Sequence, residues 1–97
     1  MLNLWLKDPH VPLRPTDAMR QPFRHLDEPA QTYCAVLHYM DSQIGRFLEE
    51  LKAVGLAENT LVLFTSDNGA AVDTGGSNGP FKGWKWHLHE VGSEVEW

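Results

Sequence analysis

The sequence has one cysteine, few basic residues and no long hydrophobic run, and each shortage excludes a class of protein. Cys34 alone cannot form an internal disulfide, so no disulfide framework organises the fold. Eight lysines and arginines against 13 acids give a formal net charge of -5, which argues against a nucleic-acid binder. No apolar run reaches membrane-spanning length, and residues 1–6 lack the basic flank of a signal peptide. At 97 residues, the chain has room for one small domain.

An apolar run that stops at polar residues lies near the middle of the chain. Residues 61–65, Leu-Val-Leu-Phe-Thr, predict a short strand that is covered on both faces. Ser66, Asp67, Asn68 and Gly69 follow as a turn. Ligands gather at the carboxyl ends of strands in open parallel sheets, so the oxygens of Asp67 and Asn68 suggest a site for a hard cation. An ordinary turn explains the same residues, because Asp, Asn and Gly are favoured there for local reasons.

A second strand is predicted at residues 1–6, followed by a loop over 7–28. Pro9 and Pro12 keep the chain around His10 extended and stiff. A histidine fixed just past a strand end is placed for acid-base work or anion contact. From the residues alone, a solvated loop histidine is the simpler explanation.

Apolar residues recur at three- and four-residue steps between the two strands and predict one long amphipathic helix over 29–54. Asp27 is the expected N-cap and Gly55 the expected C-terminal stop. The apolar positions are Tyr33, Val36, Leu37, Met40, Ile44, Phe47, Leu48, Leu51 and Val54.

Strand, helix and strand in this order predict a βαβ unit with a right-handed crossover and parallel strands. Parallel strands end at the same edge of a sheet. We therefore expect His10 to share a crevice with Asp67 and Asn68.

The loop over 66–90 is rich in glycine and then in aromatic and basic residues, and the tail 91–97 has no clear role. Lys82 and Lys85 offer positive charge for an anionic substrate, and Trp84 or Trp86 could stack on a ring. The alternative is a tryptophan-rich edge that packs on another part of the protein.

Four motifs in order resemble the sulfatase family of the alkaline phosphatase superfamily, and together they span nearly the whole chain. The motifs are Pro9-His10-x-Pro12-Leu13, a helix of the type Tyr-x-x-x-Leu-x-x-Met-Asp-x-Gln-Ile-Gly, Asn59-Thr60-Leu61-Val62-x-Phe64-Thr65-Ser66-Asp67-Asn68-Gly69, and Gly76-Ser77-Asn78-Gly79-Pro80-x-Lys82-Gly83-x-Lys85.

The resemblance implies hydrolysis of sulfate esters with a formylglycine nucleophile beside a divalent cation, usually calcium. Asp67 and Asn68 match the family's later pair of metal ligands. Lys85 matches the lysine that contacts the sulfate, and His10 matches a histidine near the sulfate and the leaving-group oxygen. The implied fold is α/β, the βαβ portion of an alkaline-phosphatase-like parallel-sheet sandwich, incomplete in this chain.

Two features depart from the family pattern. The nucleophile motif, Cys or Ser followed by x-Pro-Ser-Arg, is absent, as are the paired aspartates that open the family's metal site. The family usually reads Gly-Lys-Gly around the lysine, whereas Trp84 and Trp86 flank Lys85 here. We therefore expect residues 1–97 to form part of a sulfatase catalytic domain that is inactive in this form.

Two alternatives to the sulfatase remain at this point: a related phosphodiesterase or phosphonate hydrolase fragment, and a non-catalytic remnant that acts as an interaction module. Expected partners are a sulfated small molecule or glycan and the remainder of the domain, with no nucleic acid and no membrane segment. The resemblance suggests a secreted, periplasmic or lysosomal location for the complete enzyme.

Overall fold

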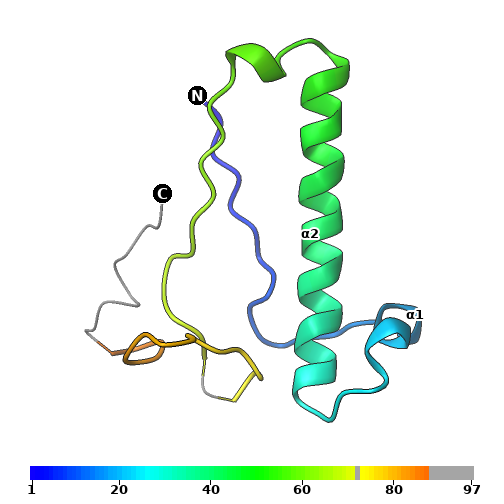
Figure 1. Cartoon of the computed structure of the whole chain (residues 1–97), viewed down its shortest axis with the longest axis vertical. Coiled ribbons are helices and arrows are strands. Elements are labelled where there is room, and N and C mark those ends of the chain that lie inside the picture. Colours follow the sequence, from blue (N-terminus) through cyan, green and yellow to red (C-terminus); the bar gives the residue numbers. More distant parts are fainter. Residues whose placement is uncertain (72, 88–97) are drawn as a thin grey trace.

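One long helix dominates the computed structural model, which describes residues 1–71 and 73–87 (Figure 1). Within these ranges the elements are the short helix α1 (Asp17–Arg20), the 3-10 helix η1 (Gln21–Phe23), the helix α2 (Ala30–Ala53) and the 3-10 helix η2 (Ala57–Asn59). None of the helices in these ranges is long and apolar enough to cross a membrane.

The start of α2 differs from the sequence prediction, and its end follows it. The N-cap is Pro29 and no side chain caps the helix, so Asp27 as N-cap is wrong; its backbone oxygen accepts the Gln31 N–H instead. At the other end Gly55 has a φ of 74°, and its N–H donates to Lys52 O. The Leu56 N–H reaches back to Leu51 O at 2.9 Å. These two bonds form a Schellman motif, which satisfies carbonyls left open at a helix end.

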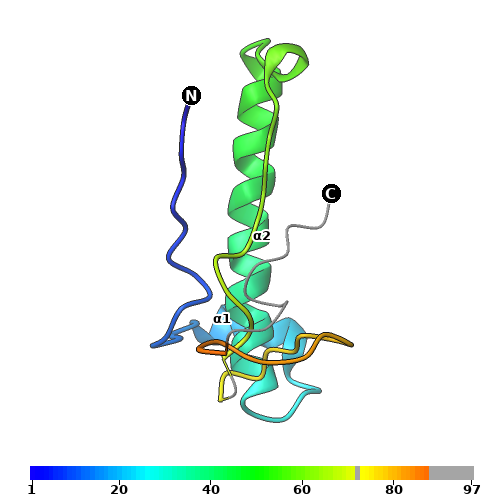
Figure 2. The same cartoon turned by 90° about the vertical axis from the view of Figure 1, so that its left-hand side faces the viewer.

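The predicted strands at 1–6 and 61–65 are not confirmed. Both segments run beside α2 in the direction opposite to the helix, as a βαβ unit requires, but no β-strand forms in the described ranges (Figure 1). Figure 2 shows the two segments well apart, on different sides of the view. A strand needs a neighbour at about 4.8 Å with which to exchange backbone hydrogen bonds. Neither segment has such a neighbour among the described residues, so both stay extended and unpaired.

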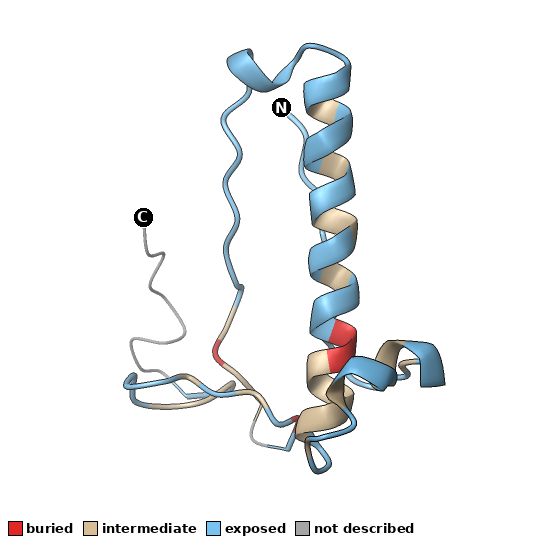
Figure 3. Ribbon diagram, turned by 45° about the vertical axis from the view of Figure 1, so that its right-hand side comes forward, coloured by how far each residue is buried: buried red, intermediate tan, exposed pale blue. Residues whose placement is uncertain are grey.

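Burial is concentrated at the start of α2 (Figure 3). Ala35 is fully buried and Val36 is 3% exposed, and the loop residue Thr74 is 6% exposed. Tyr33, Met40, Ile44, Phe47 and Leu51 are half-buried on the predicted apolar stripe, while Leu37, Leu48 and Val54 are exposed. The helix thus buries one narrow face near its N-terminus and leaves much of its length open.

The short helices are fastened to the start of α2 by polar contacts. Thr16 caps α1 by accepting the Met19 N–H at 3.3 Å. The Gln31 side chain donates to the backbone oxygens of Phe23 and Leu26, both at 3.2 Å. Arg20 forms an ion pair with Glu28 at 2.6 Å, so residues 16–28 are held against the first turn of α2.

Glu28 has a titration behaviour that links this region to pH. The Thr32 hydroxyl donates to its carboxylate at 2.9 Å and, with the Arg20 guanidinium, lowers the Glu28 pKa, although burial acts in the opposite direction. A carboxylate whose pKa is lowered on folding stabilises the folded chain above its unfolded pKa. That stabilisation is lost as the pH falls through the lowered value.

We predict that Glu28→Gln loses less thermal stability on acidification than the parent chain. Glutamine carries no charge at any pH, so the variant has no carboxylate at residue 28 whose stabilising contribution could be lost below the ordinary glutamate pKa of about 4.3. Circular dichroism melts from neutral pH to pH of about 3 measure the difference. Glu49→Gln is the control, because Glu49 is exposed on α2 without an ion pair in the described ranges. Equal losses of thermal stability at acidic pH for Glu28→Gln and the parent would contradict a stabilising role of the Glu28 carboxylate.

Candidate active site

His10 and Lys85 meet although 75 residues separate them in the sequence. The Lys85 ammonium lies 3.2 Å from His10 Nε2. His10 is exposed at the end of the first extended segment, and Lys85 is half-buried in the loop that follows the glycine-rich stretch. The contact brings together the two residues for which the family resemblance implies a position near a sulfate group.

The neighbours of the His10 ring define its tautomer. Nδ1 lies 2.7 Å from the backbone oxygen of Val11. A carbonyl only accepts hydrogen bonds, so Nδ1 carries the proton and donates. An ammonium only donates, so Nε2 accepts from Lys85 and the ring is neutral in this arrangement. Nε2 is therefore the ring nitrogen that faces the Lys85 ammonium.

Asp67 and Asn68 lie in the turn after the second extended segment. Asp67 is exposed and Asn68 is half-buried. Ser66 donates through its hydroxyl to Asn68 O at 2.7 Å, and the Asn68 amide donates to Gly69 O at 3.0 Å. Neither Asp67 nor Asn68 hydrogen-bonds His10 or Lys85 in the part of the chain that the structure describes.

The backbone connects this turn to the lysine. The Lys85 N–H donates to Ala70 O at 3.0 Å, two residues beyond Asn68. Lys85 therefore starts beside the turn that carries Asp67 and Asn68, and its side chain extends to His10. The sequence predicted one shared crevice; the structure gives one continuous set of contacts from Ala70 through Lys85 to His10.

The glycine-rich loop packs on the first turn of α2. A β-carbon on Gly75, where φ is 83°, would lie 3.0 Å from both Ala30 Cα and Ala30 N. Gly76 faces the Tyr33 ring, at a distance of 3.4 Å from its virtual β-carbon to Tyr33 Cζ. Thr74 is buried and donates through its hydroxyl to Ala71 O at 2.9 Å. The loop that leads to Lys85 is thus supported by a long helix.

Sequence reasoning did not identify Asn78 as a site residue. Its side chain bonds the backbones of Ala70 and Gly83, one before and one after the loop. An asparagine between Ser77 and Gly79 resembles an ordinary turn residue, and only the resemblance to Gly-Ser-Asn-Gly-Pro motifs could have drawn attention to it.

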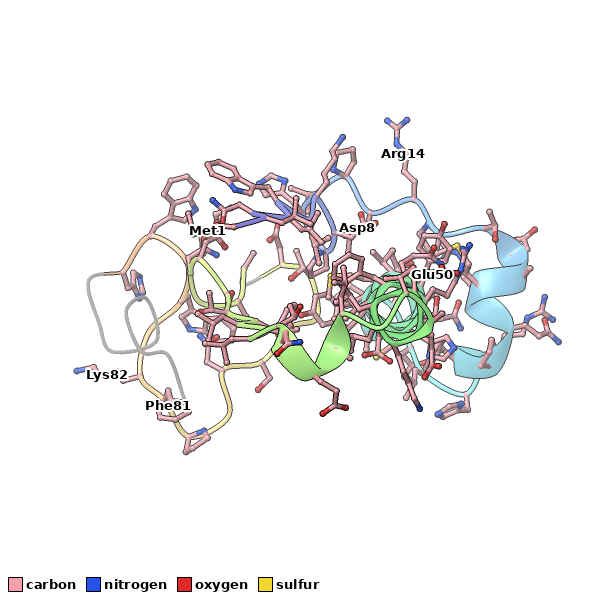
Figure 4. All side chains as sticks on the ribbon, turned by 90° about the horizontal axis from the view of Figure 1, so that it is seen from above. Met1, Asp8, Arg14, Glu50, Phe81 and Lys82 are labelled. Carbon is pink, nitrogen blue, oxygen red and sulfur yellow. The ribbon has the colours of Figure 1, made fainter. Side chains whose placement is uncertain are left out.

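Trp86 and Lys82 occupy the outer side of the same loop. Trp86 is 89% exposed, and the Lys85 ammonium lies 5.3 Å from the centroid of its ring, within cation–π range. Figure 4 shows Lys82 at the edge of the molecule with its side chain directed outward. Lys85, not Lys82, is therefore the lysine that this loop turns toward His10. Of the predicted loop over 66–90 and tail 91–97, residues 72 and 88–97 lie outside the described residues.

The donor chemistry of Asp67 and Asn68 suits a hard cation. A carboxylate and an amide oxygen are ligands that calcium takes, and calcium needs six to eight oxygens at roughly 2.4 Å. No group of three or more histidine, cysteine or acidic side chains gathers in a metal-binding arrangement within the described ranges. The two residues fit as part of such a ligand set.

Comparison with known proteins decides the family. The family model described as Sulfatase matches residues 1–94. The chain belongs to the sulfatase family. The α/β fold of that family follows at the coarse level, whereas its strands are not seen in the described residues. No solved structure was found to match the chain.

Sulfatase relatives match over the whole chain or over one part of it. An uncharacterized sulfatase, YdeN, of Escherichia coli (strain K12) is 38% identical over 98 residues, which cover 98% of the chain and 18% of that protein. Mouse arylsulfatase G is 38% identical over 99 residues, 99% of the chain and 18% of its own length. Human N-acetylgalactosamine-6-sulfatase is 49% identical over 53 residues, 50% of the chain and 10% of its length. The chain thus spans less than a fifth of the length of these relatives, and it is similar to sulfuric ester hydrolases throughout.

Proposed function

We propose that these 97 residues supply the later part of a sulfatase active site, with His10 and Lys85 on the sulfate ester and Asp67 and Asn68 on a calcium ion. The observation that carries the proposal is the contact of 3.2 Å between Lys85 Nζ and His10 Nε2. This contact joins two segments that are distant in the sequence. The hydrogen bond from the Lys85 N–H to Ala70 O places the lysine beside the Asp67-Asn68 turn.

Each of the two contact residues has a distinct task in this proposal. Lys85 is a compact positive charge that binds a sulfate oxygen and offsets negative charge as the ester bond breaks. His10 keeps its Nδ1 proton on Val11 O, so Nε2 is the atom that takes up a proton from water and then donates it to the leaving-group oxygen as the ester bond breaks. A neutral imidazole beside an ammonium also leaves one net positive charge for the anion.

Asp67 and Asn68 would hold one side of the cation, whose charge polarises the sulfate group. The remaining ligands and the formylglycine nucleophile belong to the complete enzyme in this proposal, since neither the Cys/Ser-x-Pro-Ser-Arg motif nor the paired aspartates occur in the sequence. The remainder of a sulfatase domain is then the partner that completes the site.

The family and the loop support a proposal for the substrate class. We propose a sulfated small molecule or glycan, because the exposed Trp86 ring adjoins the sulfate-binding lysine and offers a flat apolar face. The names of the relatives include N-acetylgalactosamine-6-sulfatase and steryl-sulfatase, which refer to a sugar and to a sterol.

The test compares the chain alone with a chimera. The chain incubated with calcium and a chromogenic aryl sulfate is expected to give no turnover. A chimera in which residues 1–97 replace the matched segment of mouse arylsulfatase G is expected to hydrolyse the aryl sulfate, and Asp67→Ala is expected to abolish this. Turnover by the chain alone that Asp67→Ala abolishes would overturn the partial-site proposal. A folded chimera without activity would contradict the roles of these residues.

A further inference from the structure

Asn78 joins two backbone segments with one side chain. Its Oδ1 accepts the Ala70 N–H at 2.7 Å, and its Nδ2 donates to Gly83 O at 2.5 Å. The residue is half-buried. Ala70 follows the Asp67-Asn68 turn, and Gly83 precedes Lys85 by two residues, so the amide connects the two parts of the candidate site.

Ala70 is held on both sides of its backbone. Asn78 takes its N–H, and the Lys85 N–H donates to its carbonyl at 3.0 Å. With the bond from Asn78 to Gly83, these contacts close a small cycle through Ala70, Asn78, Gly83 and Lys85. In this cycle the distance between the Asp67-Asn68 turn and the lysine backbone depends on the Asn78 side chain together with the direct bond from Lys85 N–H to Ala70 O.

A short primary amide suits this position. It presents one acceptor and one donor group on the same carbon, and both are used here. Aspartate lacks the donor, and alanine lacks both groups. Among the described residues, the neighbouring Ser77 side chain makes a local contact alone, accepting the Gly79 N–H at 3.1 Å.

We propose that Asn78 is a positioning residue that sets where Lys85 begins, and thereby directs its ammonium toward His10 Nε2. A lysine side chain has four flexible bonds, so its tip reaches a defined partner only when its backbone is fixed. The loop is fixed in turn by the contact of Gly75 with Ala30 of α2. One consequence of this positioning role rests on the proposed function. If Lys85 binds the sulfate group, Asn78 controls the affinity for it.

Amide hydrogen exchange, measured by NMR on the full 97-residue chain without ligand, tests the geometry. In Asn78→Ala, exchange of both the Ala70 and Lys85 amides is expected to accelerate about tenfold, the factor for losing one hydrogen bond. In Asn78→Asp, the Ala70 amide keeps an acceptor and its protection, while the Lys85 amide accelerates. Ser77→Ala, the matched control, is expected to change neither, and the amides of α2 stay as in the parent.

The exchange rates of the Ala70 and Lys85 amides decide whether Asn78 positions Lys85. Acceleration at Ala70 alone in Asn78→Ala would overturn the proposal, and so would unprotected Ala70 and Lys85 amides in the parent chain. If Asn78→Ala also loses the α2 amides, Asn78→Asp decides: selective acceleration at Lys85 supports the proposal, and no change overturns it.

Titration with inorganic sulfate, followed by the NMR signals of Lys85 and His10, tests the consequence. We expect Asn78→Ala to weaken binding about tenfold and Ser77→Ala to leave it unchanged. Equal affinity in the parent and in Asn78→Ala would overturn the role of Asn78 and leave the proposed function intact. If the parent binds no sulfate, the proposed function fails, whereas the exchange experiment still decides the positioning role.

Discussion

Gly75→Ala is expected to detach the glycine-rich loop from α2 and to destabilise the chain strongly. A φ of 83° costs a residue with a β-carbon about 1–2 kcal/mol. The added carbon would also lie 3.0 Å from Ala30 Cα and Ala30 N, which are backbone atoms of a helix and cannot rotate away. Conformational cost and overpacking together predict a loss of roughly 2–4 kcal/mol in the free energy of unfolding. Urea unfolding measures it, and hydrogen exchange at Thr74 reports the loop itself.

Two other glycines provide matched controls. Gly79→Ala introduces a β-carbon at a φ of 56° with no atom within 4 Å, so it bears the conformational cost without the clash. Gly45→Ala adds a methyl group to the middle of α2 in open space and is expected to stabilise the chain by about 0.5–1 kcal/mol. A Gly75→Ala chain as stable as Gly79→Ala would show that the contact with Ala30 contributes nothing.

Lys85→Ala, introduced into the arylsulfatase G chimera, is expected to lower kcat/KM for an aryl sulfate by roughly 100- to 1,000-fold. This is the range seen when one preorganised electrostatic partner of the reacting group is removed. The loss includes weaker sulfate binding and an unpaired His10 Nε2, because both depend on the same ammonium. Steady-state kinetics with a chromogenic aryl sulfate give the value.

Lys82→Ala is the control for that experiment. It removes the same charge from the same loop, but the Lys82 side chain points outward at the edge of the molecule (Figure 4). We expect a change in kcat/KM of less than about threefold, the effect of a screened surface charge. Equal losses for Lys82→Ala and Lys85→Ala would mean that the net charge of the loop matters and the contact with His10 does not.

Local patterns in the sequence predicted the long helix well and the strands poorly, for a physical reason. The stripe from Tyr33 to Leu51 and the stop at Gly55 act within one segment, since helical hydrogen bonds are formed inside the helix. Strands at 1–6 and 61–65 need hydrogen bonds from neighbouring chain, which the described residues do not supply. Asp27 failed as an N-cap because the helix begins later, after Pro29.

The sequence proposed members for the candidate site but did not predict the contacts between them. Topology and family resemblance selected His10, Lys85, Asp67 and Asn68, and their roles remain predictions. The contact between His10 and Lys85 could not be derived from either residue alone, because it depends on the path of the loop between them. Asn78 was missed since its two partners are backbone groups, which leave no signature in the sequence.

Trp86 is a position at which the sequence departs from the family pattern. The family pattern has a glycine after the lysine, and Trp86 keeps a φ of 80°, a left-handed conformation that glycine adopts freely. The backbone at Trp86 therefore has a conformation that a glycine at this position would also adopt.

The unpaired second segment has a consequence for handling the protein. Residues 61–65 are all exposed, with Leu61 at 84% and Phe64 at 66%, and they carry no charge and no proline. Short segments of this composition stack readily with identical copies into intermolecular β-sheets, because each backbone offers the next a row of open donors and acceptors. Aggregation of the isolated chain should therefore begin at this stretch, just before the turn that carries Asp67 and Asn68.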